Sequence, residues 1–358
     1  MPSLKEIKGR INSISSTLAI TSAMKMVASA KLQKAQMAIQ NMLPYERRLY
    51  SMLLDLMGAM NISAAASEDG SVRGSGSAER GFDQSGDRLS LSNRHDLAGM
   101  DGAYSLMAQR EVRKVAIVAF ASNSSLCGAF NSNAIREATA VINEYRASGL
   151  RDSDIVVYSV GRKMAEAMRK LGFPSPADFT KMSDSPSYEA ASALAQELLD
   201  GFVSGRFDKV ELVHNHYKST SSQPTTRQTY LPLSLADATA DIQVGKITDS
   251  ASESDTNRGA EPVGAPVVRQ GSPTTEDLIV EPSKEALIAT LLPKVIRLRI
   301  FTTLLDSAAA EHAARTVAMQ LATDNGNDLL QELTLEYNKG RQQKITSEIL
   351  DLVGGSMQ

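Results

Sequence analysis

The first sixty residues carry apolar and small side chains at a regular spacing of three and four. The positions on this stripe are Leu4, Ile7, Ile11, Ile14, Leu18, Thr21, Lys25, Ala28, Leu32, Ala35, Ile39 and Met42. A seven-residue repeat held over six heptads predicts a left-handed supercoil, and a single helix cannot bury such a stripe alone. The small and polar residues in its middle predict thin pairing there, or an opening towards other partners. Pro44 is expected to kink or restart the helix, which then continues to residue 60.

The end of the chain, residues 284–358, shows the same kind of stripe. Its members are Leu298, Leu305, Ala309, Met319, Leu330, Leu333 and Tyr337, with Thr302, His312, Thr316, Thr323 and Gly326 between them. About sixty residues after Pro293 contain no helix stop, and a proline is tolerated in a first turn, so Pro293 is expected at the start of the helix. Gly326 and Gly340 are its weak points, at up to about 1 kcal/mol each. The two stripes are therefore expected to pair with each other.

Strands and helices alternate between the two stripes, in residues 111–244. Strands are predicted at 112–120, 154–161, 209–217 and 226–233, with a last short strand at 278–283, and helices at 131–147, 162–171 and 187–203. Such alternation predicts a parallel or mixed sheet covered by helices. Two stretches rich in Ser and Gly, residues 61–110 and 245–277, interrupt this order. Their composition is typical of mobile insertions.

Composition places the chain among ordinary soluble proteins with room for two domains. It has 358 residues, of which 42% are hydrophobic, and a net charge of −3. Cys127 is the single cysteine, so no intrachain disulfide is expected and a reducing compartment is favoured. No apolar run approaches the about 20 residues of a membrane span, and residues 1–15 lack a signal-peptide core.

Three features of the central region could belong to a catalytic, cofactor-binding or metal site. The loop at 122–133 lies where a dinucleotide fold carries three glycines, but it contains only Gly128. Cys127 has no histidine nearby in sequence, which disfavours a nucleophile. His214 and His216 share one face of a strand at a spacing that suits a metal, but neither His95 nor His312 is an evident third ligand. No catalytic residue, cofactor or metal is therefore expected.

The first predicted helix is strongly basic. Between residues 1 and 48 there are eight basic side chains and two acidic ones; the basic ones are Lys5, Lys8, Arg10, Lys25, Lys31, Lys34, Arg47 and Arg48. The acidic chain as a whole and the lack of interleaved aromatic residues argue against nucleic acid as the partner. An acidic protein is the expected partner. Two other classes stay open: a nucleotide- or metal-binding α/β enzyme with a coiled-coil dimerisation stalk, and a structural coiled-coil tether.

Four segments resemble the γ subunits of F-type ATP synthases. They are MKMVASAKLQKAQ (Met24–Gln36), LCGAFNSN (Leu126–Asn133), EHAARTVAMQLATDN (Glu311–Asn325) and ITSEILDLVGG (Ile345–Gly355). The resemblance covers both ends and the middle of the chain, all but the two insertions. The loop SNSSLCGAF departs from the family, which usually has Asp-Arg-Gly before the leucine. Chloroplast members carry a regulatory cysteine pair that this chain lacks, so no thiol switch is expected.

The resemblance implies a fold and a function. The terminal helices would wind into an antiparallel coiled coil inside a ring of three α and three β subunits, with a Rossmann-like α/β domain inserted between them. That domain would lie against the ε subunit and the c-ring, on the cytoplasmic face of the bacterial plasma membrane. The subunit would be a non-catalytic rotor that couples ion flow to ATP synthesis.

The resemblance also implies which residues contact the β subunits. Lys25, Lys31, Lys34 and Met24 match the positions expected to meet acidic segments of β. A second set, farther along the shaft, is expected to bind loops of β through hydrogen bonds. It consists of Arg341, Gln342, Thr346 and Glu348. The other reading is packing in the seam for Met24 and a solvated helix face for the second set.

Overall fold

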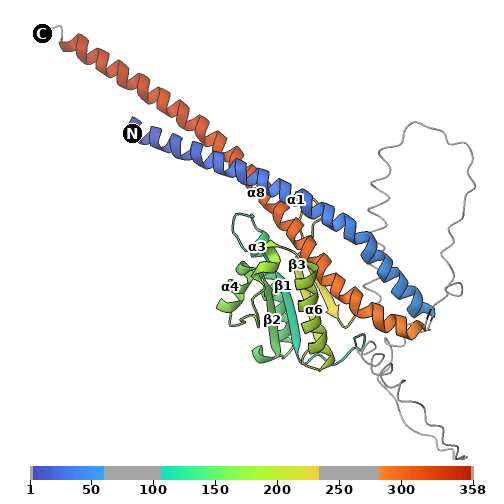
Figure 1. Cartoon of the computed structure of the whole chain (residues 1–358). Helices are drawn as coiled ribbons and strands as arrows, with labels where there is room; N and C mark the ends of the chain where they lie inside the picture. The colour runs from blue at the N-terminus through green and yellow to red at the C-terminus, as the bar shows by residue number, and fades with distance from the viewer. Residues whose placement is uncertain (1–2, 60–105, 234–280, 282, 356–358) are drawn as a thin grey trace, which may run out of the picture.

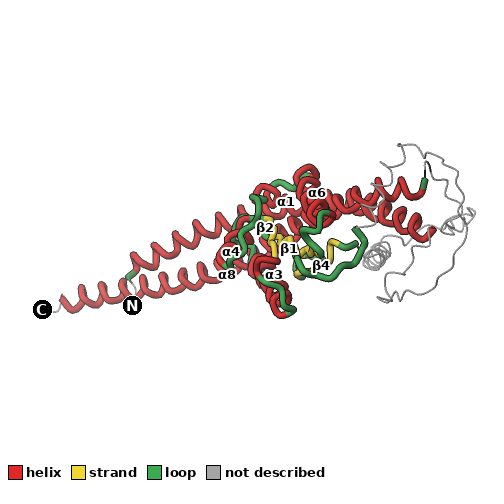
Figure 2. The backbone as a smooth tube through the Cα atoms, turned by 90° about the horizontal axis from the view of Figure 1, so that it is seen from below, coloured by secondary structure: helices red, strands yellow, loops and turns green. Residues whose placement is uncertain are grey.

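Two long helices dominate the structure, a computed structural model that describes residues 3–59, 106–233, 281 and 283–355. Helix α1 spans Leu4–Ala59 and helix α8 spans Lys284–Gly355. With 56 and 72 residues they are about 84 Å and about 108 Å long at 1.5 Å per residue. They run side by side with the α/β domain against part of their length (Figures 1 and 2). No helix in the described part of the chain has a stretch apolar enough to cross a membrane.

The two helices pair in opposite directions, as predicted from the stripes. Leu4 lies opposite Gly340, and Leu18 lies opposite Gly326, so the beginning of α1 meets the end of α8. A Cβ atom built on Gly326 would be 2.6 Å from Leu18 Cδ2, and one on Gly340 would be 3.1 Å from Leu4 Cδ2. Both glycines therefore make room for a leucine of α1, which the sequence alone did not indicate.

The middle of the seam is thin, as expected. Thr323 Oγ1 donates a hydrogen bond of 3.1 Å to Thr21 Oγ1 across the two helices. Farther along, Leu32 of α1 packs against the small residues Ala309 and Ala313 of α8. Small side chains on both helices allow a close approach but bury little apolar area, so this part of the coiled coil is held by fewer contacts than a leucine seam.

Both prolines lie inside helices. Pro44 does not restart α1, and Pro293 stands ten residues into α8 and not in its first turn, so the predicted start at Pro293 is wrong. A proline inside a helix costs about 3 kcal/mol, and tertiary packing offsets it here. The packing that holds the helices together next to the prolines joins Leu49 and Tyr50 of α1 to Val295 and Leu298 of α8.

A four-stranded sheet forms the centre of the α/β domain. Its strands are β1 (Val115–Phe120), β2 (Ile155–Val160), β3 (Lys209–Asn215) and β4 (Thr225–Leu231), in the order β2-β1-β3-β4. Strand β1 is parallel to β2 and β3, whereas β4 is antiparallel to β3. The predicted mixed sheet is therefore confirmed, with each strand within a few residues of its predicted position.

Strand β1 is one of the two inner strands of this sheet. All six of its residues are buried, as its continuous apolar sequence predicts. Ile117 pairs with Val157 on one side and with Glu211 on the other. The register between β3 and β4 shifts at Val210/Glu211.

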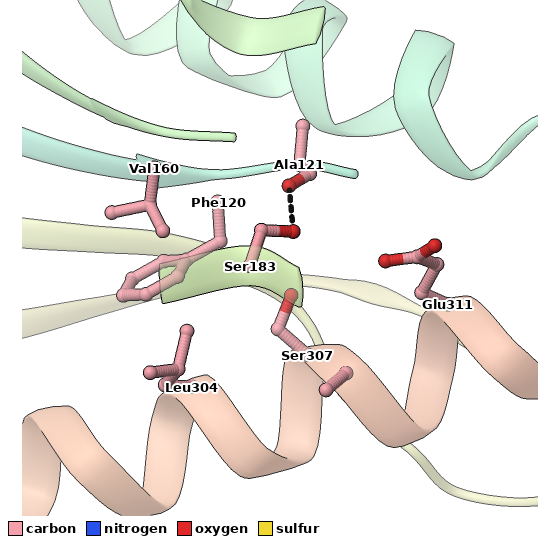
Figure 3. A pocket seen from close by; sticks show the side chains of 8 residues that line it. Phe120, Ala121, Val160, Ser183, Leu304, Ser307 and Glu311 are labelled. Atoms are coloured by element: carbon pink, nitrogen blue, oxygen red, sulfur yellow. Dashed lines mark hydrogen bonds between the residues drawn. The ribbon is translucent and has the colours of Figure 1, made fainter. Parts of the chain in front are cut away.

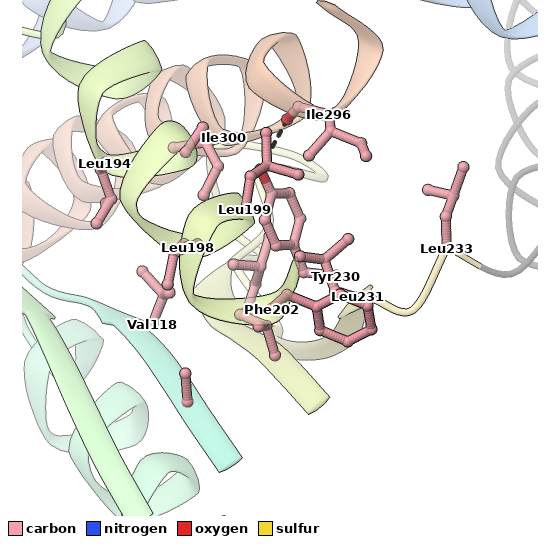
Figure 4. Packing of buried hydrophobic residues seen from close by; sticks show 14 of the residues in the cluster. Val118, Leu194, Leu198, Leu199, Phe202, Tyr230, Leu231, Leu233, Ile296 and Ile300 are labelled. Atoms are coloured by element: carbon pink, nitrogen blue, oxygen red, sulfur yellow. Dashed lines mark hydrogen bonds between the residues drawn. The ribbon is translucent and has the colours of Figure 1, made fainter. Parts of the chain in front are cut away.

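Helices cover both faces of the sheet. Besides the short helices η1 (Asp152–Asp154) and α5 (Thr180–Asp184), the domain contains α3 (Phe130–Ala147), α4 (Arg162–Lys170) and α6 (Tyr188–Val203). Helices α3 and α4 pack on one face, and α6 together with α8 covers the other. Figure 4 shows Leu194, Leu198 and Phe202 of α6 beside Ile296 and Ile300 of α8. The coiled coil thus shares its core with the domain.

The two predicted insertions, 61–110 and 245–277, lie almost wholly outside the described residues, as does most of the predicted strand 278–283. Residues 106–110 are described, and they belong to the domain. Leu106 is buried, and its carbonyl accepts a hydrogen bond of 3.0 Å from the Leu233 N–H. Arg110 donates to the Phe202 carbonyl at 3.1 Å. The domain therefore begins by residue 106, a few residues before the predicted boundary at 111.

Candidate partner interface on the coiled coil

The predicted partner residues of α1 differ in exposure. Lys31 and Lys34 are exposed, whereas Met24 and Lys25 are half-buried against α8. Met26 and Val27 are 65% and 58% exposed, which the sequence analysis missed. The signal that would have found them is an apolar side chain placed off the 3-4 stripe, because such a residue on a coiled coil faces away from the partner helix.

The charge of Lys31 influences two ionisable side chains of α8, although Lys31 itself is exposed to solvent. Burial lowers the pKa of His312 to about 4, with the nearby charges of Lys31 and Arg315 adding to the effect. Burial raises the pKa of Glu311, which outweighs the opposing influence of Arg315 and Lys31. The His312 Nδ1 atom is buried, and none of the described residues forms a hydrogen bond with it. Positive charge is therefore crowded around an uncharged imidazole at this level of the coiled coil.

The predicted partner residues of α8 are all exposed. Thr346 bonds only within its own helix, through Oγ1 to the Gln342 carbonyl at 2.9 Å, and Glu348 forms an exposed pair of 3.8 Å with Lys344. Leu4 of α1 already lies opposite Gly340, so Arg341 and the residues after it extend beyond α1 as a single helix (Figure 1). This set is free for contact with another molecule.

The single-helix end of α8, here defined as residues 341–355, also exposes apolar side chains. They are Ile345, Ile349, Leu350, Leu352 and Val353, each at least 47% exposed. A contiguous exposed apolar surface on a soluble protein commonly marks a protein interface. The sequence analysis selected four polar residues in this region and missed these apolar ones.

The structure does not bring the two predicted sets together. Leu32, next to Lys31 in α1, lies beside Ala313 of α8, and 28 residues separate Ala313 from Arg341. At 1.5 Å per residue the two sets are about 40 Å apart along the coiled coil. They form two separate surfaces, which suits contact with different parts of a long partner or with several partners.

The loop after β1 is covered by α8. Arg315 donates to Ser124 Oγ at 2.9 Å and to the Ser125 carbonyl at 2.7 Å, and it pairs with Glu311 at 2.7 Å. Cys127 is buried and receives a contact of 3.2 Å from Asn131 Nδ2. A side chain of the coiled coil therefore binds the loop at which a dinucleotide-binding fold holds phosphate.

A small cavity lies close to this loop (Figure 3). It is lined by Phe120, Ala121, Val160, Ser183, Leu304, Ser307, Ala308 and Glu311. Ser183 Oγ donates to the Ala121 carbonyl at 3.0 Å beside it. Its volume of about 10 Å³ is at the lower limit for one water molecule, so it cannot hold a nucleotide.

His214 in β3 and His216 directly after this strand face a carboxylate of α8. His216 Nδ1 is 2.8 Å from Asp306 Oδ2, and His214 Nε2 is 3.5 Å from the same oxygen. Within the described residues, no three His, Cys, Asp or Glu side chains are grouped so that they could hold a metal ion. The two histidines whose spacing suits a metal site therefore connect the sheet to the coiled coil.

Comparison with known proteins gives close relatives over the whole length. The family model described as ATP synthase matches residues 3–357. The ATP synthase gamma chain of Phocaeicola vulgatus is 46% identical over 357 residues, which is 100% of both chains. That of Bacteroides thetaiotaomicron is 44% identical over 358 residues, again 100% of both, and that of Flavobacterium johnsoniae is 35% identical over 356 residues, covering 99% of this chain and 98% of the relative.

Solved structures share the fold. One chain of the Euglena gracilis mitochondrial ATP synthase rotor is 18% identical with a TM-score of 0.51, covering 96% of this chain and 98% of the other. A chain of the same synthase in another rotational state has a TM-score of 0.52 at 18% identity, covering 99% and 93%. The pairing of two terminal helices around an inserted α/β domain is thus an arrangement known from other proteins.

Proposed function

Because the chain belongs to the ATP synthase gamma chain family, we propose that it is the rotating central stalk of an F-type ATP synthase. The stalk turns inside a ring of three α and three β subunits and couples ion flow through the c-ring to ATP synthesis on β. The ε subunit binds beside its α/β domain. The assembly places the chain on the cytoplasmic face of the bacterial plasma membrane, as a peripheral subunit.

The observation that carries this function is the coiled coil with its projecting end. Two paired helices of about 84 Å and about 108 Å are stiff, and one of them continues alone beyond the other, so the shaft has no rotational symmetry. An asymmetric shaft presents different side chains to each β subunit at each angle. A rotor works by such differences, since a partner changes conformation only where its contacts differ between states.

The chain itself acts without catalysis in this proposal. Arg315 binds the loop after β1, and the cavity beside this loop is at the lower size limit for one water molecule. Lys25, Lys31, Lys34 and Met24 contact acidic segments of β, and the exposed residues Arg341, Gln342, Thr346 and Glu348 contact β near the end of the shaft. The apolar side chains of residues 345–353 bind inside the ring, where they are removed from water.

The test is isolation of the chain from its native membrane under mild detergent. We expect a tag on residue 3 or on α4 to recover α, β, ε and c subunits in one complex whose ATP hydrolysis drives proton uptake into vesicles. The matched control is a chain that lacks residues 320–358 and therefore the upper shaft. It is expected to give no coupled proton uptake.

Two results would contradict the proposal. Recovery of the chain as a free dimer without α and β subunits would favour a coiled-coil tether. Turnover of a nucleotide by the chain alone, lost on substitution of Cys127 or His214, would favour an enzyme.

A further inference from the structure

The end of β3 touches both long helices at once. The Tyr217 N–H donates to Asp306 Oδ1 of α8 at 2.9 Å, and the Tyr217 hydroxyl accepts from Gln36 Nε2 of α1 at 2.6 Å. The Tyr217 ring also packs against the clusters around Leu32 of α1 and Phe130 of α3. One short segment of the domain is thus bonded to the two halves of the coiled coil.

Asp306 is the centre of this junction. Its carboxylate faces the Tyr217 N–H, His216 Nδ1 at 2.8 Å and His214 Nε2 at 3.5 Å. An ionised carboxylate only accepts hydrogen bonds, so the Tyr217 N–H and His216 Nδ1 donate to it, and His214 Nε2 faces it at ion-pair distance. Burial alone would raise the pKa of Asp306, but the hydrogen bonds from the two histidines outweigh it and lower the pKa to about 2. The carboxylate is charged throughout the physiological range.

The rest of this interface is largely apolar. The α6 side chains pack on Leu292, Ile296, Ile300 and Leu304 of α8. Apolar contact is non-directional, so it resists separation of the two surfaces more than it resists rotation or sliding of one over the other. Hydrogen bonds to a charged group are short and directional, and they are about twice as strong as neutral ones. Directional contacts therefore set the angle of the domain on the coiled coil.

We propose that Asp306 is a positioning residue for rotary coupling, which fixes the α/β domain on the shaft against torque through His214, His216 and the Tyr217 N–H. This set of groups is named the Asp306 clamp. The inference rests on the proposed rotor function, in which force enters at the domain and leaves through the coiled coil. The load then crosses the junction between β3 and α8.

Other polar contacts join α8 to the domain on either side of the clamp, among them Arg297 with Gln196 of α6. The Tyr230 hydroxyl donates to the Ile296 carbonyl at 2.9 Å, and Arg315 holds the loop after β1. The Tyr230 bond is to backbone and the Arg315 bonds are to a loop. Asp306 alone among these residues faces donors from the end of β3 and the residues directly after it, and β3 is an inner strand that pairs with β1 as far as Val213 and with β4 as far as Asn215.

The experiment uses the whole complex in inverted membrane vesicles. Asp306→Asn keeps the shape of the side chain and removes its charge, and His216→Gln replaces the imidazole donor at a half-exposed position by a flexible, uncharged amide. ATP hydrolysis is measured with a protonophore, which removes the load, and ATP-driven proton uptake is measured without it. Glu166→Gln on α4 is the matched control, because Glu166 pairs only with Lys163 on the outer face of the domain among the bonds seen here.

Both clamp variants are expected to hydrolyse ATP without load at the wild-type rate. Proton uptake per ATP hydrolysed is expected to fall at least about twofold in Asp306→Asn and less in His216→Gln, because loss of the charge at Asp306 weakens every hydrogen bond to this shared acceptor. The double variant is expected to lose no more than Asp306→Asn alone, since both substitutions break one unit. A structural role alone would lower the amount of complex and leave the ratio unchanged.

Each outcome decides the inference. Wild-type proton uptake per ATP in both clamp variants overturns it, and so does an equal loss in Glu166→Gln. If Asp306→Asn does not assemble, His216→Gln decides in the same way. A complex that lacks this chain and still pumps as well as the wild-type complex would overturn the rotor function itself. That result separates failure of the rotor function from failure of the clamp.

Discussion

Single side chains decide how this coiled coil meets its surroundings. Lys31 and Lys34 point to solvent from α1, whereas Lys25 is half-buried beside α8. Asp306 is charged in the interface with the domain, and His312 is uncharged in the seam. The exposed lysines thus lie outside the seam, whereas the charged carboxylate of Asp306 is paired with groups of the α/β domain.

Reversal of Lys25, Lys31 and Lys34 to glutamate tests the basic face of α1. Each exposed ion pair contributes about 0–1 kcal/mol and is weakened by salt, so no single lysine is expected to be decisive. The triple reversal replaces attraction to acidic β segments by repulsion. We expect it to lower ATP-driven proton uptake per complex more than it lowers the amount of complex in membrane vesicles.

The control for this reversal is Lys163→Glu with Lys170→Glu on α4, at the outer face of the domain. It carries the same kind of charge change away from the coiled coil. Equal proton uptake per complex in the triple variant and the control would show that the basic face carries no torque.

His312 makes stability depend on pH. Its pKa is lowered from 6.5 to about 4 in the folded chain. As pH falls from 6.5, the unfolded chain binds a proton that the folded chain does not, so stability is lost progressively down to about pH 4 and is not lost further below it. We expect His312→Gln to lose less thermal stability over this window than the wild-type chain, measured by circular dichroism.

Comparison above about pH 7 is the control for that measurement, because both side chains are then uncharged. A parallel loss of melting temperature in His312→Gln and wild type between about pH 6.5 and about pH 4 would show that other groups cause the acid sensitivity.

At the scale of elements, glycine has a different effect on packing in each of the two long helices. Gly9 of α1 has no heavy atom within 4 Å of the position that a Cβ would take, whereas at Gly326 of α8 that position is 2.6 Å from Leu18 Cδ2. The first glycine only weakens its helix. The second allows the two helices to approach.

Alanine at these two positions separates helix propensity from packing. Gly9→Ala is expected to raise the free energy of unfolding by up to about 1 kcal/mol, because alanine is the better helix former. Gly326→Ala gains the same propensity but pushes Leu18 aside, so its net gain is expected to be smaller or negative. Urea denaturation followed by circular dichroism measures both. An equal gain at the two sites would mean that the helices are not in close contact at Gly326.

At the scale of the whole molecule, the two ends of the coiled coil differ. Near the domain, α8 is buried on several sides by α1, α6 and the sheet, as its run of buried residues from 295 to 313 records. Beyond residue 340 it runs past the start of α1 as a single exposed helix (Figure 1). The first region holds the molecule together, and the second is the surface that we expect to meet partners.

Removal of residues 342–358 tests this division. The thermal stability of the isolated chain is expected to stay unchanged, because the described residues of this segment are exposed and run past the start of α1 (Figure 1). Binding to the α and β subunits is expected to weaken, since apolar side chains such as Ile349 and Leu352 lose their burial in the ring. Calorimetry of the chain and recovery of the complex measure the two effects. A large drop in the melting temperature of the free chain would show that the segment folds back on it.

Local pattern determined much of this protein. An apolar side chain at every third or fourth position shows which face of a helix is buried. Both long helices and their pairing therefore followed from the sequence. The buried run of β1 and the strand-helix alternation likewise predicted the mixed sheet. The motifs at the two ends pointed to the family before any coordinates, because they combine the seam with residues that face partners.

Tertiary structure alone decided which polar groups meet. His214 and His216 had the spacing of metal ligands, but they face Asp306, about 90 positions later in the chain. Glu211 is buried in a strand because Tyr145, Lys209 and Arg227 surround it. A hydrogen bond needs two groups within about 3 Å, and whether residues far apart in sequence reach that distance depends on how their elements pack. The periodicity of a helix or strand indicates which of its side chains are buried. It does not indicate which polar group of another element each buried polar side chain meets.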